Sequence, residues 1–344
     1  MKSLRQQIEC KLGQFPSVSL GVFPTPLQQM NRYGDLIGHP QIFIKRDDMT
    51  GLGLGGNKTR TLEFLLGEAV EKGTTTILAA GALQSNLCSL TAAAAGRLGL
   101  ECILIHNDDP PTAKQGNILL NALNGAQQKF LGTVSERKRD NHMKQVAKRL
   151  KDEGKHPYII ENSGSTPTGA LGYTSAAAEL ARQNDQLNTS IKHIAIPGAM
   201  AGTASGLVAG SALLNRPFHV HVINVEYSGS TLNKLISKYT RGVFELLEMK
   251  PPIPINKVMT IHNHALGPGY AEPTTESMQA LVELAQTEGV YLETIYTSKT
   301  LAGLKELIQK GVITPEKRCC FWHTGGVGAL FGQSATIEKW LQRL

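Results

Sequence analysis

Residues 41–66 read QIFIKRDDMTGLGLGGNKTRTLEFLL and contain the three parts of a parallel α/β unit. Gln41–Lys45 carries the β-branched and aromatic residues that are typical of a buried strand. A turn with four glycines follows at residues 51–56, and Asn57–Lys72 then shows the apolar spacing of a helix. In open α/β sheets, ligands bind beyond the carboxyl ends of strands, where such turns enter helices. We therefore expect a functional site at this turn.

Outward from this unit, the same alternation of a short strand and a helix recurs along the chain. The expected strands are 41–45, 74–80, 101–106, 127–131, 156–161, 193–197, 219–226 and 318–323. The expected helices are 57–72, 85–98, 115–123, 142–152, 169–183, 203–214, 231–243, 275–288 and 299–309, with a last one from residue 328. This alternation predicts an α/β fold with mostly parallel sheets that helices cover on both faces.

The composition excludes several classes of protein. Of the 344 residues, 41% are hydrophobic and 18% are charged, which excludes intrinsic disorder. No stretch approaches the ~18 apolar residues of a membrane helix, and the first residues lack the apolar core of a signal peptide. We therefore expect a cytoplasmic protein with no membrane partner. The net charge of +7 comes from scattered basic residues without a nucleic-acid-binding motif, so we expect no nucleic-acid partner. The densest basic run, at 136–140, is predicted to be a solvated helix face.

Neither the cysteines nor the histidines form a metal-binding pattern. The five cysteines include no CxxC pair, and Cys319–Trp322 is an apolar run that predicts a buried strand. His262 and His264 have the spacing that could place two imidazoles on one face of a strand, but two ligands do not make a metal site. We expect a loop there and no bound metal.

Two phosphate-binding motifs can be tested on the glycine-rich turn, and both fail. The glycine spacing in 51–56 matches a dinucleotide fingerprint, but the next strand ends at Gly81 without the acidic residue that would hold a ribose. Asn57 precedes Lys58 where a P-loop needs glycine. What remains is Lys58 at the start of a helix, where the partial positive charge lowers the pKa of its amine. Such a lysine suits a Schiff-base nucleophile, although the residues alone leave a surface lysine beside a flexible turn open.

Further motifs in a fixed order carry a resemblance to a known family. They are Lys45-Arg46-Asp47-Asp48, Gly55-Gly56-Asn57-Lys58, Gln84-Ser85-Asn86, Gln115-Gly116-Asn117, Gly169-x-x-Gly172-Tyr173, Gly267-Pro268-Gly269-Tyr270, Glu288-Gly289-Val290, Tyr296-Thr297-x-Lys299 and His323-Thr324-Gly325-Gly326. Together they resemble the pyridoxal-phosphate-dependent D-cysteine desulfhydrase and 1-aminocyclopropane-1-carboxylate (ACC) deaminase family, over nearly the whole chain.

The resemblance implies an architecture. The fold would be tryptophan-synthase-β-like, that is, fold type II of the pyridoxal-phosphate enzymes, with two open, mostly parallel twisted sheets flanked by helices. Residues 1–51 and 166–344 would form a large cofactor-binding domain, and residues 52–165 a small α/β domain, with the cofactor between them. The resemblance also implies a homodimer.

The resemblance further implies roles for individual residues. Lys58 would bind pyridoxal phosphate covalently and then take a proton from a small amino-acid substrate. Asn86 would contact the phenolic oxygen of the cofactor, and Thr324 would lie beside its pyridine nitrogen. The phosphate would bind backbone N–H groups at a helix N-terminus. The implied catalytic residues are Lys58, Ser85, Tyr270 and Tyr296; the cofactor-binding residues are Lys58, Asn86, Gly198, Ala199, Met200, Ala201, Gly202, Thr203 and Thr324; the substrate-binding residues are Gln84, Ser85, Asn86, Tyr270 and Tyr296.

Two threonines favour one branch of the family. ACC deaminases carry Glu after the second tyrosine and Leu in the final motif, where this chain has Thr297 and Thr324. A hydroxyl beside the pyridine nitrogen leaves the ring a weaker electron sink than a carboxylate does, and this suits β-elimination. We expect a desulfhydrase-like lyase that yields a 2-oxo acid and ammonia, with sulfide if the substrate is cysteine. ACC deaminase activity (a hydrolase), a cofactor-binding protein without turnover, and other cofactor chemistry such as racemisation or β-replacement stay open.

Four places depart from the family pattern. Leu87 stands where a polar residue is usual, Thr61 replaces a lysine, and Ser163–Thr166 replaces a Gly-Gly-Ser-Asn stretch. Ala199–Ala201 makes the phosphate loop poor in glycine and hydroxyl groups, which the backbone can tolerate if no residue there needs a positive φ. We expect an altered substrate pocket and weaker cofactor binding.

Overall fold

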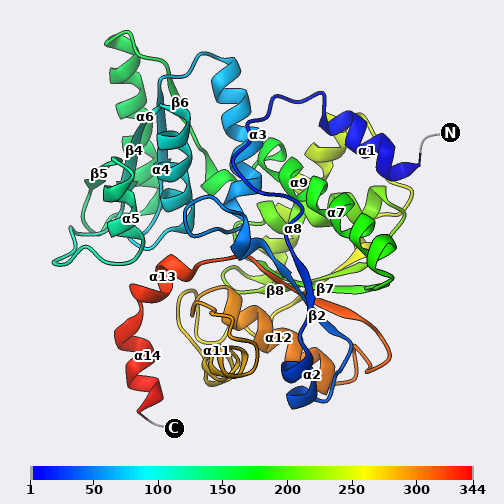
Figure 1. The fold of residues 1–344 in the computed structure, drawn as a ribbon. Coiled ribbons are helices and arrows are strands. Elements are labelled where there is room, and N and C mark those ends of the chain that lie inside the picture. The colour runs from blue at the N-terminus through cyan, green and yellow to red at the C-terminus, as the bar shows by residue number, and fades with distance from the viewer. Residues whose placement is uncertain (1–2, 343–344) are drawn as a thin grey trace.

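The computed structural model describes residues 3–342, which form two sheets flanked by helices (Figure 1). The larger sheet has six strands in the order β1-β2-β10-β7-β8-β9. Its strands are β1 (Leu27–Gln29), β2 (Ile42–Arg46), β7 (His193–Gly198), β8 (His219–Asn224), β9 (Met259–His262) and β10 (Cys319–His323). Neighbouring strands are parallel except β1 and β2. The carboxyl ends of five strands therefore meet at one edge, where ligands of α/β sheets bind.

Apolar side chains pack against both faces of this sheet. The helices on one face are α7 (Pro167–Leu187), α8 (Gly202–Leu213) and α9 (Gly229–Leu247). Those on the other face are α2 (Asn31–Ile37), α11 (Thr275–Glu288) and α12 (Thr297–Gln309). Burial on both faces explains why β7 and β10 are apolar between their terminal residues rather than alternating.

The smaller sheet has four parallel strands in the order β5-β4-β3-β6. They are β3 (Thr76–Ala80), β4 (Glu101–His106), β5 (Gln127–Phe130) and β6 (Pro157–Ile159). Its helices are α3 (Lys58–Glu71), α4 (Asn86–Leu98), α5 (Asn117–Leu123) and α6 (Glu136–Asp152). One core joins α3 and α4 to the sheet, and a second core joins α6 to its other face.

The remaining helices lie at the ends and in the connections. They are α1 (Leu4–Leu12), the 3₁₀ helices η1 (Asp47–Met49) and η2 (Asn162–Gly164), α10 (Ile255–Val258), α13 (Val327–Phe331) and α14 (Ser334–Leu341). The N-terminal α1 packs against α7 and α9. In contrast, α14 extends away from both sheets and buries none of its side chains (Figure 1).

The predicted fold class and the alternation of strands and helices are confirmed. The sequence reasoning missed α1, β1, α2, α10 and β9, because these short elements carry no clear apolar period. Two expectations are wrong. His262 ends β9 and pairs with Ile223, so it is not in a loop. The helix predicted over 142–152 starts at Glu136, so it includes the run 136–140 that was expected to be a helix face, because Ser135 caps it and accepts a hydrogen bond from the Lys138 N–H at 3.3 Å. The domain ranges stay a prediction.

Three imidazoles form a hydrogen-bonded row across β7, β8 and β9. His193 Nδ1 and His221 Nε2 are 2.9 Å apart, and His221 Nδ1 and His262 Nε2 are 3.0 Å apart. Burial, reinforced by neighbouring cationic groups, lowers the pKa of His221 to about 2 and those of His193 and His262 to about 4. The row is therefore neutral at pH 7.

Two further expectations concern membranes and thiols. None of the helices within residues 3–342 is both long and apolar enough to cross a bilayer. Cys319–Trp322 lies fully buried in β10, as predicted.

No group of three potential metal ligands that could hold an ion occurs in the described part of the chain.

Candidate active site

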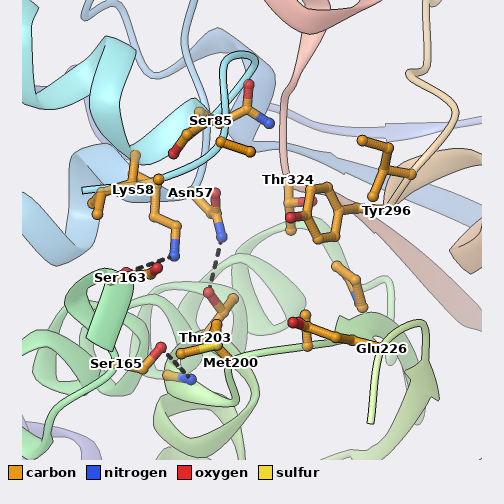
Figure 2. Close-up of a pocket in the computed structure, with 18 of the residues that line it drawn as sticks. Asn57, Lys58, Ser85, Ser163, Ser165, Met200, Thr203, Glu226, Tyr296 and Thr324 are labelled. Carbon is orange, nitrogen blue, oxygen red and sulfur yellow. Dashed lines mark hydrogen bonds between the residues drawn. The ribbon is translucent and has the colours of Figure 1, made fainter. Parts of the chain in front are cut away.

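A pocket of about 420 Å³ lies at the carboxyl ends of β3, β7, β8 and β10 (Figure 2). Loops after these strands supply Ser85, Ala199, Glu226 and Thr324, and Lys58 enters from the start of α3. Every site residue predicted from the sequence lines the pocket except one. The exception is Gly198, whose Cα faces away, since a Cβ there would meet the side chains of β8 and α9. The fold thus gathers side chains that are far apart in the sequence.

Lys58 is the first residue of α3, and its Nζ donates a hydrogen bond to the carbonyl oxygen of Ser163 at 3.1 Å. Burial lowers the pKa of the Lys58 amine to about 8, although the nearby Glu226 carboxylate opposes this shift. A substantial fraction of this amine is therefore neutral near pH 8, and a neutral amine can act as a nucleophile or a base.

The glycine-rich turn is shaped by close backbone contacts. Gly55 has a φ of 73°, and a Cβ at this residue would lie 1.8 Å from the carbonyl oxygen of Asp48. Gly56 has a φ of 137° and forms a β-bridge with Gly325. Only glycine fits both requirements. Close backbone contacts therefore define the turn before Lys58, and Lys58 lines a pocket rather than lying on the open surface.

The loop from β7 to α8 presents the N-terminus of a twelve-residue helix to the pocket. The N-cap residue, Ala201, makes no side-chain cap and has a φ of 72°. The loop therefore does need a positive φ at Ala201. An alanine-rich loop was expected to be tolerated only if no residue in it had a positive φ, so this expectation is not met. A non-glycine residue in this conformation costs about 1–2 kcal/mol. Two side chains from outside the loop reach it: Ser165 Oγ accepts the Gly202 N–H at 3.2 Å, and Asn57 Nδ2 donates to Thr203 Oγ1 at 2.9 Å.

Residues 84–86 form the opposite wall of the pocket. Ser85 caps α4, and its Oγ accepts the N–H of Cys88 at 3.3 Å. Asn117 orients the two flanking residues: its Nδ2 donates to Asn86 Oδ1 at 2.9 Å, and its N–H donates to Gln84 Oε1 at 2.9 Å. The hydroxyl and the first N–H groups of α4 together form a site that suits a carboxylate.

Tyr270, which is 42% exposed, and Tyr296 both line the pocket. Their hydroxyl groups are hydrogen-bonded to each other, and their ring centroids are 6.0 Å apart. Burial is the main reason that the pKa of Tyr270 rises to about 12 and that of Tyr296 rises well above its usual value. Both phenols are therefore neutral at pH 7. Glu293 holds Tyr296 in place, because Glu293 Oε1 accepts the Tyr296 N–H at 2.8 Å.

The sequence reasoning missed several pocket residues, of which Glu226, Ser165 and Arg139 matter most. Glu226 ends the predicted strand 219–226, and a carboxylate at the carboxyl end of a parallel strand is the signal that points to it. The expectation that residues 136–140 form a solvated face is wrong for Arg139. Its side chain is buried because α6 packs on the sheet, and it donates to Asn107 Oδ1 at 3.0 Å.

The departures from the family pattern occupy the same region. Leu87, in the first turn of α4, is buried in the core and lines the pocket, so it adds apolar surface rather than a polar group. Thr61 is buried beside Gly164 and Gly169. The Met200 sulfur accepts a hydrogen bond from the Tyr227 hydroxyl at 2.9 Å.

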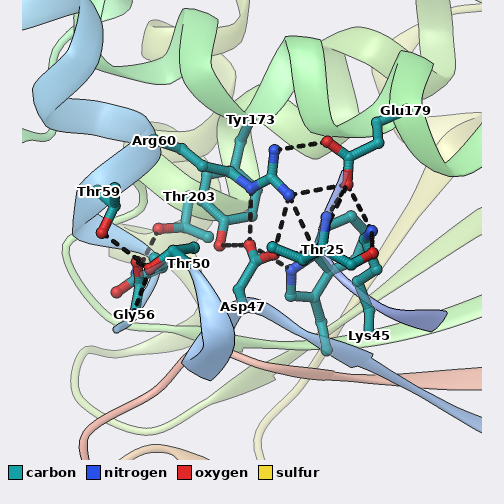
Figure 3. A network of polar contacts seen from close by, with 12 residues as sticks. Thr25, Lys45, Asp47, Thr50, Gly56, Thr59, Arg60, Tyr173, Glu179 and Thr203 are labelled. Atoms are coloured by element: carbon teal, nitrogen blue, oxygen red, sulfur yellow. Dashed lines mark hydrogen bonds and ion pairs between the residues drawn. The ribbon is translucent and has the colours of Figure 1, made fainter. Parts of the chain in front are cut away.

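A buried ionic network supports the site from below (Figure 3). Asp47 accepts hydrogen bonds from four side chains. Arg60 donates two of them, from Nε and from one terminal nitrogen, each at 2.9 Å. The others come from Thr25 at 2.8 Å, Tyr173 at 2.5 Å and Trp322 at 2.8 Å. Burial alone would raise the pKa of Asp47, but Arg60 outweighs it and the pKa falls to about 2. Glu179 joins Arg60 to Lys45, whose Nζ lies 2.5 Å from its carboxylate. Since Arg60 lies two residues after Lys58, this network fixes the start of α3.

These groups fit pyridoxal phosphate on three counts. Lys58 offers an amine with a lowered pKa to an aldehyde. The N-terminus of α8 lacks a side-chain cap from its own N-cap residue and faces the pocket, which suits a phosphate. Thr324 directly follows β10 and presents a neutral hydroxyl group to the pocket.

Comparison with known proteins decides the family. The family described as "Pyridoxal-phosphate dependent enzyme" matches residues 18–325. The chain belongs to this family. Its cofactor is therefore pyridoxal phosphate. The enzyme is 33% identical over 331 residues to the D-cysteine desulfhydrase of Serratia proteamaculans (strain 568). The aligned region covers 94% of this chain and 98% of the relative.

Two further similarities extend over nearly the whole of this chain. It is 30% identical over 338 residues to a protein of Pyrococcus furiosus named as a putative ACC deaminase, covering 98% of this chain and 100% of the relative. The solved structure of an ACC deaminase homologue superposes with a TM-score of 0.88 and 32% identity, covering 97% of this chain and 98% of the other. The predicted family and fold group are confirmed.

Proposed function

We propose that this enzyme is a lyase of the D-cysteine desulfhydrase type, which removes the β-substituent of a small amino acid and yields a 2-oxo acid and ammonia. The observation that carries this proposal is the amine of Lys58, which shares a pocket with the N-terminus of α8 and has a pKa of about 8. That value supports the use of Lys58 as a base near neutral pH.

In this proposal the phosphate of the cofactor lies at the N-terminus of α8. The backbone N–H groups of 198–203 are the ligands that the family resemblance implies. We add the hydroxyl of Ser165, because it is buried and already accepts a hydrogen bond from the first residue of α8. It supplies a hydroxyl that Ala199–Ala201 lacks.

The side chains around the substrate have separate tasks. When bound, pyridoxal phosphate supplies the electron sink that stabilises negative charge at the substrate Cα. Lys58 takes the Cα proton and holds it as an ammonium group. Ser85 and the first N–H groups of α4 bind the substrate carboxylate. The Tyr270–Tyr296 pair lies between the pocket and solvent, and limits the entry of water.

ACC deamination is the second candidate, because two of the similar proteins carry that activity in their names. The side chains favour elimination instead. Thr297 is fully buried and donates its hydroxyl to Glu293 Oε1 at 2.9 Å, so it brings no carboxylate to the substrate. Thr324 brings a hydroxyl to the pocket wall rather than an apolar or an acidic group.

The decisive test is a product assay with the purified holoenzyme. Sulfide and pyruvate from D- or L-cysteine support the proposed lyase, whereas 2-oxobutanoate from ACC supports the alternative. Lys58→Ala serves as the control, since it should abolish the visible absorbance band of the lysine-bound cofactor. Turnover of ACC alone, with no sulfide from either enantiomer of cysteine, contradicts the proposal.

Two statements about the whole molecule belong to the same proposal. We propose a homodimer, which the exposure of Phe331 and Leu341 in α13 and α14 supports, since a partner chain could cover these apolar side chains. Light scattering on the purified protein tests it. We propose a cytoplasmic location, which the four buried thiols support because such groups persist in reducing compartments. They are Cys88, Cys102, Cys319 and Cys320.

A further inference from the structure

Glu226 is a carboxyl group in the pocket to which the reaction described above gives no role. It follows β8 directly, and its main chain is held in place by Asn224. Asn224 Oδ1 accepts the Glu226 N–H at 3.2 Å, and Asn224 Nδ2 donates to the carbonyl oxygen of Tyr227 at 2.5 Å. The N–H of Val225 donates to the carbonyl oxygen of Gly198 at 3.0 Å. Glu226 therefore has a fixed position relative to the phosphate loop.

The other ionisable groups of the pocket are either hydrogen-bonded within the chain or largely exposed. Glu293 accepts the N–H groups of residues 295–297, at 2.6–2.8 Å. Arg139 donates to Asp140 at 3.0 Å, and the side chain of Glu136 is 65% exposed. Within the described chain the Glu226 carboxyl group has no polar neighbour beyond Tyr227, whose hydroxyl donates to the Met200 sulfur at 2.9 Å. Glu226 is therefore available to a substrate.

Glu226 also lies among the groups that surround the reacting atoms. Figure 2 shows it on the side of the pocket where Tyr296 lies, across from Ser85. Burial raises the pKa of Glu226 to about 7, Glu136 adds to the shift, and Tyr227 and Lys58 oppose it. An acid with a pKa near the working pH donates protons most effectively. Tyr270, with a pKa raised to about 12, is a much weaker acid.

We propose that Glu226 is the catalytic acid that protonates the departing β-substituent; this rests on the elimination proposed above. Lys58 takes the proton from Cα, and the electron pair of that C–H bond forms the Cα=Cβ double bond. The bond from Cβ to the substituent breaks, and the substituent keeps the electron pair. It accepts the proton of the Glu226 carboxyl group and leaves as a neutral molecule. Glu226 regains a proton from water at the pocket mouth.

This assignment defines the class of substrate. Hydroxyl and thiol substituents leave as strong or moderate bases and need a proton, whereas chloride needs none. Glu226 therefore suits β-hydroxy and β-thiol amino acids, and it gives no advantage with a β-halogen.

The test uses this difference between leaving groups. Holoenzyme and Glu226→Gln are assayed with serine, cysteine and β-chloroalanine, in both enantiomers. We expect turnover of serine to fall by about 100-fold or more, which is the usual contribution of a general acid. The loss with cysteine should be smaller, because the departing hydrosulfide is a much weaker base than hydroxide, and turnover of β-chloroalanine should be unchanged. Glu245→Gln, an exposed residue of α9, controls for the loss of one charge.

A second measurement does not depend on turnover. Infrared difference spectra of the cofactor-free protein should show a carboxylic-acid band that titrates near pH 7 and is absent in Glu226→Gln. An equal loss with all three substrates, or no loss with serine, overturns the role of Glu226. A wild-type enzyme that eliminates none of the three overturns the proposed function itself, so the two failures are distinguishable.

Discussion

Substitution of Ser165 by alanine should weaken the binding of pyridoxal phosphate but not that of pyridoxal. The Ser165 hydroxyl is buried and lies 3.2 Å from the Gly202 N–H, at the helix end where the phosphate is placed. A hydrogen bond to a charged group contributes about 1.5–3 kcal/mol. Removal of this bond should therefore raise the Kd for pyridoxal phosphate by about 10- to 150-fold.

The assay is a titration of cofactor-free protein, followed by the absorbance of the lysine-bound group. Pyridoxal reacts with the same amine and lacks the phosphate, so its Kd should not change. Ser163→Ala is the matched control, because Ser163 contacts Lys58 through its main-chain carbonyl group, which alanine retains. An equal loss of affinity for both compounds would show that Ser165 shapes the pocket in general. Unchanged affinity for pyridoxal phosphate would show that the hydroxyl is not a phosphate ligand.

Three further predictions follow from buried ionisable groups. Attachment of the cofactor should accelerate as the pH rises through about 8, because the neutral amine of Lys58 reacts, and a midpoint near 10.5 in stopped-flow absorbance would contradict the lowered pKa. Asp47→Ala should lower the free energy of unfolding in urea by about 3–5 kcal/mol, because it leaves Arg60 buried without its main partner. Asp185→Ala, which breaks an exposed pair with Arg5, should cost at most about 1 kcal/mol, and equal losses would refute the argument. His221 has a folded pKa of about 2, below its unfolded value, so the stability linked to it is present above pH ~6.5 and is lost as the pH falls. His221→Asn should flatten the decline of unfolding free energy between pH 7 and 5, and an unchanged slope would exclude this residue as its source.

The sequence predicted the parts of the fold that depend on local patterns. The predicted helix 275–288 and the predicted strand 101–106 agree with the observed bounds to the residue. Each element is long enough to show its own apolar pattern. Strand β1 was missed because it has three residues, is mostly exposed and gains its order from pairing with β2. Such an element is specified by its partner rather than by its own residues.

The candidate site also contains residues that the local sequence predicts and residues that it does not. Lys58 was predicted because a glycine-rich turn and a helix start surround it in the sequence. Arg139 was mispredicted, since a basic run with helical spacing looks the same whether or not one of its side chains turns inward. The backbone of Ala201 also escaped prediction, because its φ of 72° is imposed by the loop and is not favoured by alanine. Contacts between distant segments decide these details.

The bridge between Gly56 and Gly325, with the Asn57 N–H donating to the Thr324 carbonyl oxygen at 2.9 Å, joins the two sheets beside the reactive amine. These contacts tie the turn that carries the lysine to the loop that carries Thr324 through main-chain atoms alone. Replacement of the side chain at Asn57 or at Thr324 therefore leaves the spacing between the amine and the end of β10 in place.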